Sequence, residues 1–335
     1  MRIDPTFDPS DWSSLPEYTL DLGYWASPER PTLLEAGSID RARTAISYET
    51  TPTQSNLLVI DDDGRWFGVD TDGIEFANNV DAALGLSRRS LSPDGTRLAI
   101  GQADSIVVID LITTETRTYP ISDLPPVWEG REVSWNAAGT SVFLARTMPV
   151  GNSDKGYRYP NGYQLDLDTG ATTLLEHDPD HAVTLSDGTV IANQWGQDTG
   201  DNVVATDTNG TRTPLDDVAR TLGAATDFAV SPTNMWAVRR EARMVPDLVE
   251  GVSGFMAFDG FAPLAALPVK DVENNGGGGE LLGWLTSDHA VFSMPVDEVL
   301  GPATDVGTVI WDVRDGTLWR GPLSIANARI SISPR

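Results

Sequence analysis

Residues 91–119, LSPDGTRLAIGQADSIVVIDLITTETRTY, contain the pattern that decides the fold. SPDG (92–95) is a turn signature, because proline presets one backbone angle and glycine accepts a positive one. Residues 97–101 roughly alternate polar and apolar side chains, as in a half-buried strand, and 105–111 form an apolar, β-branched run typical of a buried strand. Residues 115–119 follow at hairpin distance. With the residues just before it, this stretch predicts four short antiparallel strands, which must stack on further copies to bury a core.

The second hairpin of this unit recurs along the chain. Each copy has an apolar strand, an acidic turn that often contains glycine, and another strand. The six copies are LLVIDDDGRWFGV (57–69), VVIDLITTETRTY (107–119), YQLDLDTGATTLL (163–175), VVATDTNGTRTPL (203–215), GFMAFDGFAPLAAL (254–267) and TVIWDVRDGTLWRGPL (308–323).

The first hairpin of the unit recurs as well, in a looser form. Its copies are SLSPDGTRLAI (90–100), SWNAAGTSVFL (134–144), TLSDGTVIAN (184–193), AVSPTNMWAV (229–238), the weaker WLTSDHAVFS (284–293) and a half copy, ARISISP (328–334), at the end of the chain. The repeats alternate without helical patterns between them, which favours an all-β repeat fold.

The two ends of the chain have complementary defects. The first unit starts at 43–48 without an inner strand, and residues 329–333 could supply that strand. We therefore predict an all-β, six-bladed β-propeller of four-stranded antiparallel blades, closed by strand exchange between the N- and C-terminal parts. A seventh blade built around residues 17–40 is the alternative. Residues 1–40 are expected to be a lead-in segment that docks on a single propeller domain, 41–335.

Charge and composition exclude several classes of function. The chain has 49 acidic and 23 basic residues, a formal net charge of −26, and only two lysines, Lys155 and Lys270. This balance disfavours binding to nucleic acid or to anionic lipid. The absence of cysteine excludes disulfides, thiolate metal sites and cysteine nucleophiles. No apolar run approaches the roughly 20 residues of a membrane helix. We expect no cofactor, no direct membrane insertion and a monomer.

The turn SPDGTRLA (92–99) and its copies, each followed by an apolar strand and an acidic turn such as DLDTG (166–170), resemble the TolB-like, or WD-repeat-like, β-propellers of bacteria. The resemblance covers residues 43–334. It implies a propeller of non-catalytic character and an extracytoplasmic location, and it implies no functional residue, because the motif residues are structural in that family. Residues 1–30 lack the form of a signal peptide, so a cytoplasmic location is the alternative.

The long connections of the predicted blades are the expected contact surface. The tight turns would lie at one end of the strands, and the long connections would all leave the other end. Aromatic and basic residues there are typical anchors for a protein partner or a small polar ligand. The candidate residues are Lys155, Tyr157, Arg158, Tyr159, Trp195, Arg239, Arg240 and Arg243. The other interpretation is that these side chains pack on one another and pair with neighbouring aspartates.

Other chemistry has weaker support in the sequence. His177 and His181 in HDPDH could hold a metal, although an ordinary polar loop is the simpler interpretation. The runs DDDG (61–64) and DTDG (70–73) hint at calcium loops but lack EF-hand spacing, which favours plain turns. GGGG (276–279) is not followed by the residues of a phosphate-binding loop.

Two hypotheses about function remain. The first is a non-catalytic binding module that uses the loop-rich face. The second is a hydrolase or lyase that acts on a carbohydrate-like substrate at the channel mouth, where Glu129, Glu132 and Glu280 are conceivable acids. No G-x-S-x-G motif is present, so nothing in the sequence favours a serine nucleophile. The sequence favours the first hypothesis.

Overall fold

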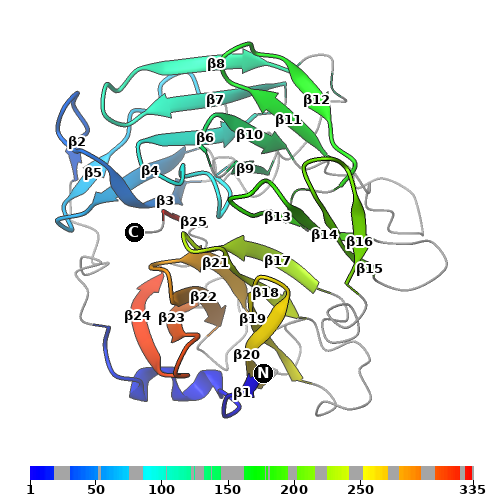
Figure 1. Ribbon diagram of the computed structural model, residues 1–335. Coiled ribbons are helices and arrows are strands. Elements are labelled where there is room, and N and C mark those ends of the chain that lie inside the picture. The colour runs from blue at the N-terminus through cyan, green and yellow to red at the C-terminus, as the bar shows by residue number, and fades with distance from the viewer. Residues whose placement is uncertain are drawn as a thin grey trace, which may run out of the picture. The chain divides into compact units, whose positions relative to one another are not determined.

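Six small β-sheets make up the fold, which is an all-β, six-bladed β-propeller (Figure 1). The computed structural model describes residues 1–18, 31–51, 54–74, 86–102, 104–121, 124, 132–136, 138–144, 162–177, 179, 182–194, 202–215, 225–240, 252–270, 279–295, 306–324 and 329–333. The blades fall into two compact units: one contains residues 1–20, 180–326 and 335, and the other contains residues 21–179 and 327–334. The predicted fold class is confirmed.

Blades 1 to 3 belong to the second of these units. Blade 1 contains β2 (Thr32–Leu33), β3 (Ala42–Thr51), β4 (Gln54–Asp61), β5 (Trp66–Gly68) and β25 (Arg329–Ile332). Blade 2 contains β6 (Arg97–Gly101), β7 (Ser105–Asp110) and β8 (Thr116–Pro120). Blade 3 contains β9 (Val133–Trp135), β10 (Ser141–Leu144), β11 (Tyr163–Asp166) and β12 (Thr172–Leu174).

Blades 4 to 6 belong to the other unit. Blade 4 contains β13 (Ala182–Thr184), β14 (Val190–Gln194), β15 (Asn202–Thr206) and β16 (Arg212–Pro214). Blade 5 contains β1 (Arg2–Ile3), β17 (Ala225–Val230), β18 (Met235–Arg240), β19 (Val252–Asp259) and β20 (Ala262–Lys270). Blade 6 contains β21 (Glu280–Trp284), β22 (His289–Pro295), β23 (Val306–Asp312) and β24 (Leu318–Ser324).

The predicted exchange of strands between the two ends of the chain is confirmed. Strand β25 pairs antiparallel with β3, with Ile330 opposite Ile46 and Ser331 opposite Ala45. The hydroxyl group of Ser331 also accepts a hydrogen bond from the Leu91 backbone and donates one to the Arg88 carbonyl, which ties β25 to blade 2. The C-terminal strand is therefore held from both sides, by the strand ladder of blade 1 and by side-chain bonds to blade 2.

Blade 2 differs from the predicted four strands, because its inner strand is reduced to one bridge between Leu91 and Leu98. The chain before this bridge turns back on itself, with the Ser90 backbone N–H donating to the Ser87 carbonyl. The carbonyl of Ser90 still accepts from the Ala99 backbone N–H at 2.8 Å. Part of the fourth-strand ladder thus survives without forming a regular strand.

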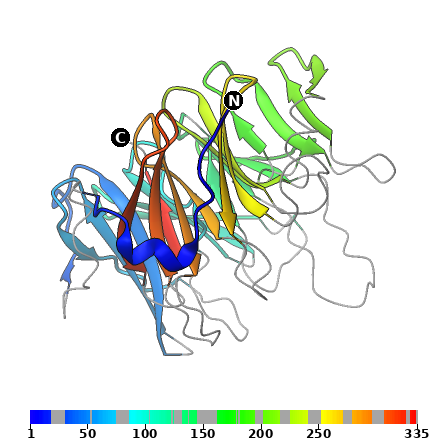
Figure 2. The same cartoon turned by 90° about the horizontal axis from the view of Figure 1, so that it is seen from below.

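The N-terminal segment, defined here as residues 1–18, lies along outer sheet edges. Strand β1 adds parallel to β20, Phe7 continues this pairing at Val269, and Glu17 forms a parallel bridge to Arg320 of β24. Between these contacts the 3₁₀ helix η1 (Pro9–Ser14) crosses from blade 5 to blade 6 (Figure 2). Strand β2 adds parallel to β5 in the same way. The described parts of residues 17–40 therefore join existing sheets, and the alternative of a seventh blade is wrong.

Tryptophan side chains lock neighbouring inner strands together in both units. Trp135 of β9 donates its indole N–H to the Ser90 carbonyl at 2.7 Å, and Trp284 of β21 donates to the Ala229 carbonyl at 3.1 Å. Both indoles are buried, at 9% and 1% exposure. Each indole thus fills the space between two blades and satisfies a buried carbonyl there.

Aspartates cap the hairpins between the third and fourth strands. In five blades the aspartate that ends or follows the third strand accepts backbone N–H groups of its own turn on Oδ1; these residues are Asp61, Asp110, Asp166, Asp207 and Asp312. The bonds lower the pKa of Asp166 and Asp207, chiefly through the Thr169 side chain in one case and the Thr211 N–H in the other. The acidic repeats of the sequence are therefore turn caps.

Removing either indole N–H should destabilise the protein. We expect Trp135→Phe and Trp284→Phe each to lower the free energy of unfolding by about 0.5–1.5 kcal/mol, because each removes one hydrogen bond to a buried carbonyl. Urea unfolding of the two variants and the wild type measures this loss. A loss below about 0.5 kcal/mol in both variants would show that the carbonyls of Ser90 and Ala229 find other partners.

Candidate functional site

The predicted contact residues lie mostly outside the described part of the chain. Lys155, Tyr157, Arg158, Tyr159, Trp195 and Arg243 fall there. Arg239 and Arg240 are the last two residues of β18, opposite Phe255 and Gly254 of β19, and the side chain of Arg239 is half-buried. These two arginines stand where β18 leads into the connection 241–251. Their backbone is thus at the end of the blade from which the long connection starts, and the contact surface remains a prediction.

The weaker candidates also stay separate over the described residues. His177 is half-buried and its carbonyl accepts from the Gly162 N–H at 2.9 Å, while His181 lies outside the described residues. Glu129 lies outside them as well, Glu132 directly precedes β9, and Glu280 begins β21. Within the described ranges, no group of three or more His, Asp or Glu side chains could hold a metal ion.

The two aspartate-rich runs form turns. Asp61 accepts the backbone N–H groups of Asp63 and Arg65 on Oδ1, each at 2.9 Å, and Asp70 accepts the N–H of Asp72 at 3.0 Å. These bonds are the local pattern expected of a turn-capping aspartate.

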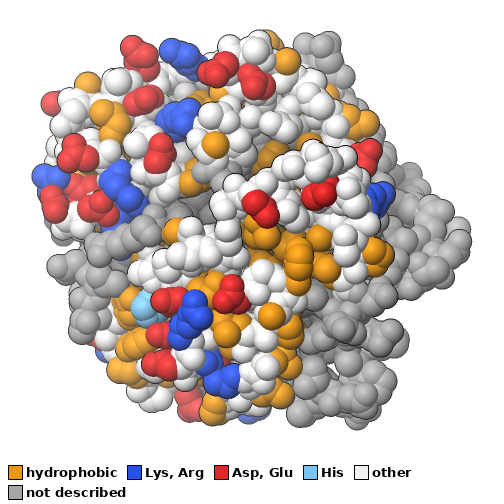
Figure 3. Space-filling model, in the orientation of Figure 1, with side chains coloured by type: hydrophobic (Ala, Val, Ile, Leu, Met, Phe, Trp, Pro, Cys, Tyr) orange, Lys and Arg blue, Asp and Glu red, His pale blue; other side chains and the backbone are white. Residues whose placement is uncertain are grey.

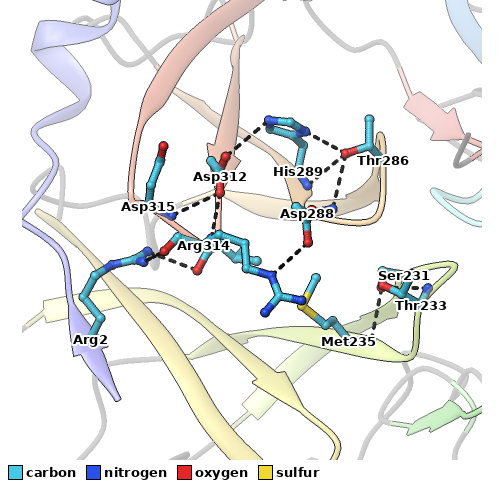
Figure 4. Close-up of polar contacts among 11 residues, drawn as sticks. Arg2, Ser231, Thr233, Met235, Thr286, Asp288, His289, Asp312, Arg314 and Asp315 are labelled. Carbon is cyan, nitrogen blue, oxygen red and sulfur yellow. Dashed lines mark hydrogen bonds and ion pairs between the residues drawn. The ribbon is translucent and has the colours of Figure 1, made fainter.

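A polar network in blade 6 joins two tight turns (Figure 4). The first turn links β21 to β22 and the second links β23 to β24. Arg314 donates from Nε to Asp288 Oδ1 at 3.0 Å, and the Val313 N–H donates to the Asp288 carbonyl at 3.0 Å. Acidic and basic side chains gather on the face of the molecule over this blade (Figure 3). Both turns of the blade are thus cross-linked at the end opposite its long connection.

The N-terminal segment is anchored to the second of these turns. Arg2 donates to the carbonyls of Val313, at 3.1 Å, and Arg314, and it pairs with Asp4 at 2.5 Å. The buried carboxylate of Asp4 accepts the indole N–H of Trp311 at 2.8 Å. The hydrogen bond to Asp4 raises the pKa of Arg2. Burying a carboxylate destabilises a fold unless the charge is paired, and Arg2 and Trp311 supply the donors that offset this cost.

Further along the segment, two more contacts hold it to blades 5 and 6. Trp12 is buried and donates its indole N–H to the Thr308 carbonyl at 2.9 Å, at the point where a bulge shifts the pairing of β23 with β24. Asp8 caps η1 and accepts from Lys270 of β20 at 2.7 Å. The Lys270 bond, followed by those from Ser10, lowers the pKa of Asp8 to about 2.

His289 lies between the polar network and the end of the N-terminal segment. Its Nδ1 is 2.6 Å from Thr286 Oγ1, and its Nε2 is 3.6 Å from Asp312 Oδ2. Its ring meets the rings of Tyr18 and Trp319 edge to face, with centroids 5.5 and 5.4 Å away. The imidazole is 22% exposed. Charged and aromatic groups therefore surround the imidazole of His289.

A hydroxyl, an imidazole and a carboxylate in this order resemble the parts of a nucleophilic catalyst. Here, however, Thr286 Oγ1 also accepts the backbone N–H groups of Asp288 and His289, at 3.3 and 3.2 Å. Ser231 caps the corresponding turn of blade 5 in the same way, accepting from Thr233 and Met235. The Thr286 hydroxyl is thus a turn cap of the repeat.

Sequence reasoning missed this cluster. The sequence pattern assigned no role to His289, although the weak repeat WLTSDHAVFS (284–293) contains it. A usable signal was present: a histidine begins the second strand of blade 6, three residues after a turn-capping hydroxyl. Its proximity to Tyr18 could not be read from the sequence, because the two residues are far apart in the chain.

Comparison with known proteins supports the fold. No protein-family model matches the chain. No curated protein matches it either. Among solved structures, an oligogalacturonate lyase from Vibrio parahaemolyticus is similar with a TM-score of 0.51 and 12% identity, covering 87% of this chain and 77% of the lyase. A putative TolB from Agrobacterium tumefaciens gives a TM-score of 0.49 and 14% identity, covering 88% of this chain and 99% of that protein.

The β-propeller domain of the Trilobed protease from Pyrococcus furiosus gives a TM-score of 0.43 and 12% identity, covering 85% of this chain and 83% of that domain. At 12% identity the likeness to the lyase concerns the fold alone, and nothing is concluded from the two structures with TM-scores below 0.5. Within the described residues, no helix has the length and apolar character needed to cross a membrane.

The pair between Asp8 and Lys270 should make stability depend on acid pH. Because the pKa of Asp8 is lowered to about 2, its contribution is fully present above the ordinary aspartate pKa and is lost as the pH falls from about 4 to about 2. Urea unfolding over this range should show a smaller loss in Lys270→Met than in the wild type. At neutral pH, Lys270→Met should lower the free energy of unfolding by only about 0.5 kcal/mol, because the lysine side chain is 66% exposed. Identical pH dependence in both proteins would contradict this assignment.

Proposed function

We propose that the chain is a non-catalytic binding module that holds a protein partner or a small polar ligand on the long connections of blades 3 to 5. One observation carries this proposal. At the tight-turn ends of the blades, the polar side chains described above are committed to their own hairpins, as with the capping oxygen atoms of Asp166, Asp207 and Thr286. The longer connections, which join the second strand of a blade to the third, start from the other ends of the strands.

The charge of the long connection in blade 3 supports a partner with acidic groups. The connection between β10 and β11 contains Arg146, Lys155 and Arg158 against one acid, Asp154, in a chain whose net charge is −26. Arginines and tyrosines in such positions are typical anchors of an interface. The proposal includes a monomer that works outside the cytoplasm, and the location rests on the resemblance of the SPDG turn motif to TolB-like propellers.

The alternative is a hydrolase or lyase that acts on a carbohydrate-like substrate. The similar structure from Vibrio parahaemolyticus is an oligogalacturonate lyase, which is an acidic-sugar enzyme by name. At 12% identity this likeness concerns the fold alone. Oligogalacturonate is therefore a useful second probe, because a binding module should leave it intact and a lyase should cleave it.

An array of acidic peptides, printed beside copies with Asn and Gln in place of Asp and Glu, tests the proposal. We expect binding to a subset of the acidic peptides only, and at least a tenfold loss of signal (order of magnitude) in the variant Arg158→Ala/Arg239→Ala/Arg240→Ala. The matched control is Arg65→Ala/Arg212→Ala/Arg314→Ala, which removes the same positive charge at tight turns and should bind like the wild type.

Equal losses in both triple variants would contradict a local contact surface and would indicate a general charge effect. Cleavage of oligogalacturonate by the wild type, followed by chromatography of the products, would favour the enzyme alternative. Binding without cleavage would favour the module.

A further inference from the structure

The neighbours of His289 decide which of its two ring nitrogens carries the proton when the imidazole is neutral. A hydroxyl oxygen can accept two hydrogen bonds, and Thr286 Oγ1 already faces the N–H groups of Asp288 and His289. Its own proton therefore points to His289 Nδ1, 2.6 Å away. The neutral ring must then have its single proton on Nε2, on the side of Asp312.

Adding a proton to this ring alters the contacts of both nitrogen atoms, and both changes favour movement in the same direction. A proton on Nδ1 would face a hydroxyl oxygen whose acceptor positions are occupied, which pushes the ring away from Thr286. At the other end, the positive ring attracts Asp312, whose Oδ2 is 3.6 Å from Nε2, beyond hydrogen-bond distance. A charge-assisted bond closes to roughly 2.7–2.9 Å. Both effects move the ring toward β23.

The charged groups around the ring favour this shift. Those facing it come from the turn between β21 and β22, from the turn between β23 and β24, and from the N-terminal segment; they are Asp288, Asp312, Arg314, Asp315 and the phenol of Tyr18. Arg314 is already paired with Asp288 at 3.0 Å. Asp312 is the carboxylate that can pair with the imidazole, because its Oδ2 lies 3.6 Å from Nε2.

The same ring supports the end of the N-terminal segment. Tyr18 contacts both His289 and Trp319, with its centroid 5.3 Å from the Trp319 ring. The backbone beside it is held to β24 by two bonds: the Arg320 N–H donates to the Pro16 carbonyl at 2.9 Å, and the Tyr18 N–H donates to the Arg320 carbonyl at 3.1 Å. A ring that moves toward β23 withdraws from one side of the aromatic cluster that holds this backbone.

We propose that His289 is a proton-operated latch, which holds residues 16–18 on the edge of β24 when the ring is neutral and releases them when it is protonated. Histidine is the side chain that proteins most often use for a change of charge near neutral pH, which suits it to such a latch. The released edge of β24 would expose the N–H and C=O groups that the segment now covers. This proposal concerns the tight-turn side of blade 6 and does not depend on the proposed binding surface.

Amide hydrogen exchange of the full chain at about pH 7.5 and about pH 5.5 tests the latch, with rates corrected for the pH dependence of the chemical exchange step. In the wild type we expect protection at Tyr18 and Arg320 to fall about tenfold at the lower pH. In His289→Gln, which stays neutral, protection at these amides should be the same at both values. The proposal would be overturned if protection at Tyr18 and Arg320 did not fall in the wild type, or if it fell equally in His289→Gln.

A second pair of variants keeps the test independent of His289 itself. Asp312→Asn keeps an Oδ1 that can accept the turn N–H groups of Arg314 and Asp315 but removes the charge that attracts the ring. It should reduce the tenfold change to about threefold or less. The matched control is Asp207→Asn, the corresponding turn cap of blade 4, which should keep the full change. Equal behaviour of Asp312→Asn and the wild type would remove Asp312 from the mechanism.

Discussion

Unpaired backbone groups at the edges of small sheets are the constraint on which this structure depends. A sheet of three or four short strands has two edges, and each edge has N–H and C=O groups that need partners. Here the inner edges are closed by side chains, such as Trp135 to Ser90 and Trp284 to Ala229, and by the C-terminal strand β25. The outer edges of blades 1, 5 and 6 are covered by parallel additions from the first part of the chain.

The remaining outer strands solve the same problem by composition. Strands β8, β12 and β16 are short and polar, and β8 and β16 each end in a proline, Pro120 and Pro214. Short edges, threonine-rich sequence and proline discourage pairing with another chain. Three blades therefore have a covered outer edge, and three have an outer edge with a short, polar strand. In the N-terminal segment, the buried residues Asp4, Phe7 and Trp12 hold the covering chain in place.

The distribution of polar side chains separates the two ends of the blades. At the tight turns, aspartates and hydroxyl groups satisfy backbone N–H groups, so their chemistry is largely used within the fold. His289 is the exception in blade 6, because its imidazole lies 3.6 Å from the Asp312 carboxylate and also contacts Tyr18. We therefore propose a regulatory function at this end and recognition at the long connections.

The sequence by itself determined the repeat, the six blades and the exchange of strands between the chain ends, because turn chemistry and strand alternation are local properties that a short window contains. It also placed the acidic residues in turns, as Asp61 and Asp70 illustrate. Tertiary structure decided the rest. The inner strand of blade 2 was reduced to one bridge, the N-terminal segment was laid on two outer edges and β2 on a third, and Tyr18 was brought to His289. These outcomes depend on pairing between residues far apart in the chain, and no local pattern encodes which distant backbone or ring will satisfy a given edge.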